Sequence, residues 1–68
     1  MVAIQKKLGE TIRNLRKDTG ITQEQLAVKT KMDLTSINEI ENGRRNPSLK
    51  TITKIANALG TTAAKLLD

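Results

Sequence analysis

The stretch that decides the fold is residues 22–43, TQEQLAVKTKMDLTSINEIENG. Thr22 can accept a hydrogen bond from a free backbone N–H at a helix start, and Gln25, three residues later, completes a Thr-x-x-Gln capping box. Asp33 can cap a second helix, which stops at Gly43. Two short helices separated by a turn of about three residues are typical of a helix-turn-helix.

Helical patterns continue on both sides of this stretch. Upstream, one helical face is traced by Ile4, Leu8, Ile12 and Leu15. Downstream, Pro47 precedes or begins a further helix, whose apolar stripe is Leu49, Ile52, Ile55, Ala56 and Leu59. Thr61 or Thr62 can cap a last short helix that contains Leu66 and Leu67. The sequence therefore predicts an all-α fold. It is a compact five-helix domain over residues 1–68, with the helix-turn-helix at about residues 22–43.

The composition excludes several classes of function. The 68 residues include no Cys and no His, which removes the commonest general base and the commonest transition-metal ligands. We therefore expect no enzyme activity and no catalytic, cofactor or metal site. No window approaches the roughly 18 consecutive apolar residues of a membrane span. The expected location is the cytoplasm, in association with the nucleoid.

The charge favours a nucleic-acid partner. Twelve Lys and Arg against seven Asp and Glu give a formal net charge of +5, which favours a polyanion. Proteins that bind single strands commonly stack bases on Phe, Tyr or Trp, and this chain has none of them. Double-stranded DNA is therefore the expected partner.

Three ordered motifs carry a resemblance to a known family. They are Gly20–Ala27 (GITQEQLA), Ser36–Gly43 (SINEIENG) and Asn46–Leu49 (NPSL). On these residues the chain resembles the phage-repressor-like (Xre-type, lambda-repressor-like) helix-turn-helix DNA-binding family, over roughly residues 5 to 67. The resemblance implies five helices, of which the second and third form the helix-turn-helix and the third is the recognition helix.

The resemblance implies that the start of the third helix meets base edges in the major groove. If Ile37 and Ile40 face the core, the outward residues expected to read bases are Leu34, Thr35, Ser36, Asn38 and Glu39. Leu34 can pack on a thymine methyl, Asn38 can read adenine if its face allows, and Glu39 can accept from the cytosine amino group. The alternative is that these residues are only the solvent face of a surface helix.

The resemblance also implies contacts to the DNA backbone. Gln23, beside free N–H groups at a helix N-terminus, is expected to contact a phosphate. The other expected phosphate ligands are Asn42, Arg44, Arg45, Asn46, Ser48 and Lys50. For the two arginines the alternative is a solvated pair of loop charges. Arg16 and Glu41 match a buried ion pair of the family, so both are assigned to the fold.

Two positions depart from the family pattern. The turn usually holds a Gly in a left-handed conformation, and here that position is Lys31. A residue with a side chain costs on the order of 1–2 kcal/mol there. Thr30 is more polar than the apolar residue usual at its position. Both departures concern the angle at which the recognition helix is held.

The predicted function is transcriptional regulation by sequence-specific binding to double-stranded DNA. One recognition helix reads few base pairs, so a homodimer on a palindromic operator is expected, with half-sites about 34 Å apart. The dimer surface is expected on the fourth and fifth helices or their loop, with Leu66 and Leu67 as candidates. Repression is the simplest outcome, and activation through contact with RNA polymerase is the other. An antitoxin that also binds a toxin protein, and a protein-interaction module, are the alternatives.

Overall fold

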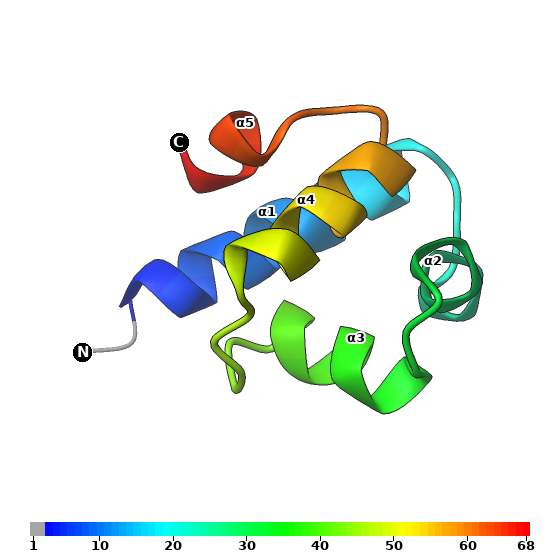
Figure 1. Cartoon of the computed structure of the whole chain (residues 1–68), viewed down its shortest axis with the longest axis horizontal. Helices are drawn as coiled ribbons and strands as arrows, with labels where there is room; N and C mark the ends of the chain where they lie inside the picture. Colours follow the sequence, from blue (N-terminus) through cyan, green and yellow to red (C-terminus); the bar gives the residue numbers. More distant parts are fainter. Residues whose placement is uncertain (1–2) are drawn as a thin grey trace.

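The computed structural model describes residues 3–68, with side chains from Ile4 onward, and it contains five helices in this range (Figure 1). They are α1 (Ala3–Asp18), α2 (Gln23–Thr30), α3 (Leu34–Glu41), α4 (Leu49–Ala58) and α5 (Ala63–Leu67). The described part of the chain contains no strand, so the predicted all-α, five-helix architecture is confirmed. None of these helices is long and apolar enough to cross a membrane.

Side-chain caps fix where the helices begin. Thr22 and Gln25 form the predicted capping box, with the Gln25 N–H on Thr22 Oγ1 at 3.0 Å and the Thr22 N–H on Gln25 Oε1 at 2.8 Å. Asp33 caps α3 by accepting the Ser36 N–H at 2.7 Å, and this backbone hydrogen bond lowers the pKa of Asp33. Ser48, one residue after the proline, caps α4. The chain therefore enters each of these helices through a hydroxyl or carboxylate side chain.

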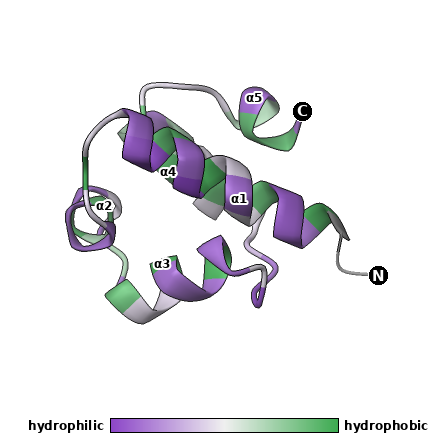
Figure 2. Cartoon of the chain, turned by 180° about the vertical axis from the view of Figure 1, so that it is seen from behind, coloured by the Kyte–Doolittle hydropathy of each residue, from purple (hydrophilic) through white to green (hydrophobic). Residues whose placement is uncertain are grey.

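The core lies between α1, α4 and the helix-turn-helix. Contacts join α1 to α3 and α5, α2 to α3 and α4, and α4 to α5. The buried apolar residues are Leu8, Ile12, Leu26, Ala27, Ile37, Ile40, Ile52, Ile55, Ala56, Leu59 and Leu66. Figure 2 shows hydrophilic and hydrophobic residues alternating along α1 and α4, as expected for helices with one buried face. α2 and α3 lie on one side of the molecule and α5 on the opposite side (Figure 1).

Two residues of the predicted apolar stripes are not in the core. Ile4 is 78% exposed and Leu49 is 64% exposed, so their placement on the buried faces is wrong. Both lie in the first turn of a helix. At the C-terminus the two candidate dimer residues differ, because Leu66 is buried and Leu67 is about half exposed.

The turn of the helix-turn-helix has the left-handed residue at the predicted position. Lys31 has φ 58° and ψ 36°, and it is the one described non-glycine residue with a positive φ. The preceding Thr30 is buried, and its hydroxyl donates to the carbonyl oxygens of Leu26 at 2.8 Å and Ala27 at 3.2 Å. Because the hydroxyl is satisfied within its own helix, a polar residue fits where the family usually has an apolar one.

Candidate nucleic-acid interface

A buried ion pair attaches α3 to α1. Arg16 donates from Nε to Glu41 Oε2 at 2.7 Å and from Nη2 to Glu41 Oε1 at 3.1 Å, and the Glu41 side chain has no exposed surface. Arg16 Nη1 also donates to the Ile21 carbonyl at 2.9 Å. The structure thus brings together the two residues assigned to the fold. Their two-point contact fixes the end of α3 on the scaffold.

The environment of Glu41 keeps its carboxylate charged. Burial raises the pKa of Glu41, but hydrogen bonds from Arg16 and Gln23 and the charges of Arg16 and Arg13 outweigh it, so the net pKa lies below the ordinary value of 4.5. The carboxylate therefore stays ionised at neutral pH and keeps all its donors.

A ring of polar side chains extends from this carboxylate to the surface. Gln23 Nε2 donates to Glu41 Oε1 at 3.0 Å, and Gln23 Oε1 accepts from Asn38 Nδ2 at 3.4 Å. Asn42 Nδ2 donates to Asn38 Oδ1 at 3.2 Å, and Arg13 Nη2 donates to Asn42 Oδ1 at 2.9 Å. Residues of α1, α2 and α3 therefore hold Gln23 and Asn42, two expected phosphate ligands, in one arrangement.

The faces of α3 separate buried from exposed residues. Its buried stripe is Ser36, Ile37, Ile40 and Glu41. The expectation that Ser36 faces outward is wrong. Ser36 lies four residues before Ile40 and is 9% exposed, so it shares the buried stripe. Leu34, at 43% exposure, and Thr35 and Asn38 lie on the exposed face.

Glu39 and Arg45, expected in two different roles, contact each other. Arg45 donates to Glu39 Oε1 from Nη2 at 2.7 Å and from Nε at 3.1 Å. The backbone after α3 brings them together, because Gly43 has φ +72° and the N–H of Arg44 reaches back to the Glu39 carbonyl at 2.9 Å. The loop therefore folds back along α3.

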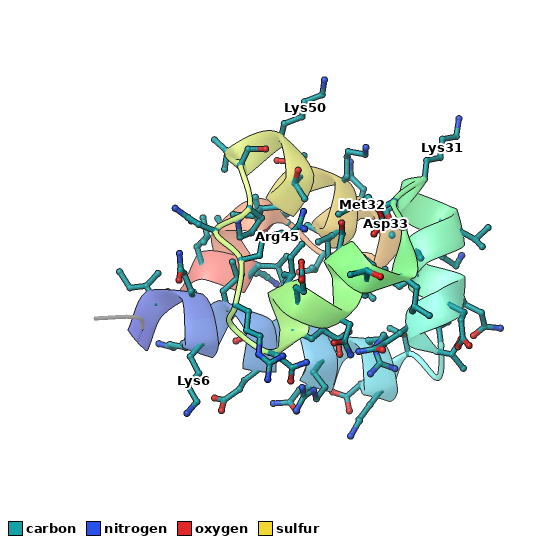
Figure 3. The ribbon with its side chains drawn as sticks, turned by 90° about the horizontal axis from the view of Figure 1, so that it is seen from below. Lys6, Lys31, Met32, Asp33, Arg45 and Lys50 are labelled. Atoms are coloured by element: carbon teal, nitrogen blue, oxygen red, sulfur yellow. The ribbon has the colours of Figure 1, made fainter. Side chains whose placement is uncertain are left out.

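The remaining expected phosphate ligands lie in the loop after α3 and at the start of α4. Arg44, Asn46, Ser48 and Lys50 are all exposed. Figure 3, viewed onto the α3 side, shows Lys31 and Lys50 pointing toward one side of the molecule and Lys6 toward the opposite side. Positive charge thus flanks α3 on both sides.

Sequence reasoning missed one contributor, Arg13. It approaches Glu41 Oε1 to 3.5 Å and contacts Asn42. The signal was available, since Arg13 precedes Arg16 by three residues and so shares its helical face.

Comparison with known proteins decides the family. The sequence profile of the family described as helix-turn-helix matches residues 12–66. The chain belongs to this helix-turn-helix family. The control protein C.MunI of Mycoplasma sp is 39% identical over 66 residues, which are 96% of this chain and 89% of that protein. The immunity repressor protein of Bacillus phage phi105 is 42% identical over 53 residues, 78% of this chain and 37% of that protein.

A solved structure shows the same helix-turn-helix architecture. The restriction-modification controller protein C.AhdI from Aeromonas hydrophila matches with a TM-score of 0.91 and 38% identity, covering 94% of this chain and 97% of that chain. The resemblance inferred from the three sequence motifs is thereby confirmed. In this helix-turn-helix protein α2 and α3 are the two helices of the motif, and α3 is its second helix.

Proposed function

We propose that this protein is a transcriptional regulator that binds double-stranded DNA by placing α3 in the major groove. The observation that carries the proposal is the exposed face of α3, which is free of core contacts and has cationic side chains on both sides (Figure 3). The major groove admits one α-helix, and phosphates line both of its edges. The matched control and repressor proteins support the same function.

Base contacts are assigned to the start and middle of α3. Leu34 packs on a thymine methyl, and Thr35 donates or accepts at a neighbouring base. The amide nitrogen of Asn38 has two N–H groups, of which Gln23 occupies one, so the other remains for a base acceptor. Glu39 lies beside these residues on α3 and accepts from Arg45.

Phosphate contacts are assigned to both sides of α3. One N–H of the Gln23 amide donates to Glu41, and the second N–H is assigned to a phosphate beside the N-terminus of α2. Asn42 lies on the same side of α3 as Gln23, because both side chains hydrogen-bond to Asn38. On the other side the phosphate ligands are Arg44, Asn46, Ser48 and Lys50, near the free N–H groups of the first turn of α4.

The shortness of the recognition helix α3 favours a homodimer. Eight residues of α3 span about 12 Å, which covers only three or four base-pair steps of about 3.4 Å. Two copies on a palindromic operator double the sequence that is read. We assign the dimer contact to the α4–α5 end, where Leu67 is exposed. Occupying an operator excludes RNA polymerase from overlapping DNA, so the proposed outcome is repression.

Selection from a random duplex library at about 50 and 200 mM salt, followed by sequencing, tests this proposal. Enrichment of a palindrome, with affinity that falls steeply with salt, is expected. Thr35→Ala alters the preferred base at one position of each half-site, whereas Arg44→Ala weakens all sequences alike. Absence of binding at both salt concentrations contradicts the proposal.

A further inference from the structure

The pairing of Glu39 with Arg45 changes what each residue can do in a DNA groove. A free carboxylate among phosphates is repelled by them, whereas this carboxylate is neutralised by a guanidinium at 2.7 Å. Both side chains keep substantial exposure, 47% for Arg45 and 37% for Glu39. The pair therefore stays at the surface of α3 as one nearly neutral, directional unit.

The geometry of the contact determines which part of Arg45 remains available. Nε and Nη2 both donate to Glu39 Oε1, so the side edge of the guanidinium is occupied. The end edge, made by Nη1 and the second N–H of Nη2, is free and carries two parallel donors. Two parallel donors match the O6 and N7 acceptors of guanine in the major groove.

The position of the pair along α3 places it over the bases. Glu39 lies five residues after Leu34, which is about 7.5 Å along the helix axis. That distance corresponds to about two base-pair steps of about 3.4 Å. The backbone also fixes the arginine, because the loop is folded back by Gly43 and by the hydrogen bond from the Arg44 N–H to the Glu39 carbonyl.

Resting on the proposed function, we infer that Arg45 is the guanine-reading residue of each half-site and that Glu39 is the positioning residue that orients its guanidinium. The guanine lies about two base pairs from the bases that meet Leu34 and Thr35. Glu39 itself does not accept from a cytosine, because its carboxylate is committed to Arg45. Arg45 therefore contributes sequence preference in addition to any attraction to the backbone.

Four variants in the same library selection test the inference. The wild-type protein selects a guanine at the stated position. Arg45→Ala loses preference at that position alone, and its affinity for the wild-type site falls about 5- to 150-fold. Arg45→Lys keeps the charge and the salt dependence but loses the guanine preference, since Lys has no two-donor fork. Arg44→Ala, the matched neighbour, weakens all sequences alike and leaves the preferred bases unchanged.

Glu39→Gln tests the orientation of the Arg45 guanidinium separately from the reading of guanine by Arg45. Its guanine preference weakens without a new base replacing it, and the same change has no effect in the Arg45→Ala background. Far-UV circular dichroism verifies that each variant is folded. Unchanged base preferences in Arg45→Ala, or a switch to a different base in Glu39→Gln, overturn the inference while the proposed function stands. A wild-type protein that selects no site overturns the proposed function and the inference with it.

Discussion

Glu41→Gln removes the charge at the junction of α1, α2 and α3 while preserving the shape of the side chain. In the native protein the Glu41 carboxylate accepts two hydrogen bonds from Arg16 and one from Gln23, and it has no exposed surface. The variant turns an amide N–H toward one of these donors. It also leaves Arg16, whose side chain is 11% exposed, without a counter-charge.

The expected magnitude follows from the burial of the pair. Removing one partner of a buried ion pair costs about 3–5 kcal/mol, because the other charge stays buried and uncompensated. A chain of 68 residues has a total free energy of unfolding on the order of 3–10 kcal/mol. Glu41→Gln is therefore expected to remove a third or more of the stability. The amide has one acceptor oxygen in place of two, so the hydrogen bonds that orient Arg16 and Gln23 are weakened and DNA affinity falls even in the folded fraction.

Urea unfolding followed by far-UV circular dichroism measures the change, since the chain has no Trp or Tyr for fluorescence. The control is the double variant Arg16→Met with Glu41→Leu, which replaces both charges by apolar groups. It should be more stable than Glu41→Gln, because no buried charge is left unpaired; Arg13, which also approaches Glu41, has a side chain that is 37% exposed. A loss below about 1 kcal/mol in Glu41→Gln would refute the assignment of a stabilising role to this pair.

Three further predictions concern strain, packing and pH. Lys31→Gly relieves the left-handed conformation and raises the free energy of unfolding by about 0.5–1 kcal/mol. Lys31→Ala removes the charge and the side chain beyond Cβ but keeps the Cβ that causes the strain, so it gives no such gain in urea unfolding. Gly43→Ala places a Cβ 2.9 Å from Lys6 Cα and should lower the urea midpoint of unfolding. The decrease should exceed that of Gly20→Ala, because Gly20 has a similar φ but open space around it. Equal decreases in the two midpoints would show that the contact with Lys6 is unimportant. The pKa of Glu41 is lower in the folded protein than its ordinary value. The stability that this shift contributes is present above about pH 4.5 and is lost as pH falls through the folded-state pKa. The free energy of unfolding should therefore fall more steeply with acidification in the wild type than in Glu41→Gln.

Much of the fold could be predicted because its signals are local. The capping box of Thr22 and Gln25, the Asp33 cap and the 3.6-residue periodicity each depend on residues within two turns of one another. Burial at helix ends depends instead on how far neighbouring helices extend. Periodicity alone therefore placed Ile4 and Leu49 in the core, where the structure exposes them.

The candidate site was also predictable only where its signals are local or follow from the family resemblance. Charge, the exposed start of α3 and the Arg16–Glu41 pair could be inferred from sequence and family resemblance. Ser36 was placed on the wrong face, since the buried stripe of α3 includes Ser36 and Glu41 in addition to its two isoleucines. The Glu39–Arg45 contact could not be predicted, because it depends on the backbone path of the loop after Gly43.

DNA reading by α3 is tested most directly by an NMR titration of the ¹⁵N-labelled protein with the duplex selected from the library. If α3 reads DNA, the largest shift changes fall on α3 at Leu34 and Thr35, on Gln23 and on the loop that holds Arg44 and Arg45. Signals from the interior of α1 should change little. Shift changes confined to α5 and the N-terminal turns of α1, with α3 unaffected, would contradict the claim that α3 reads DNA.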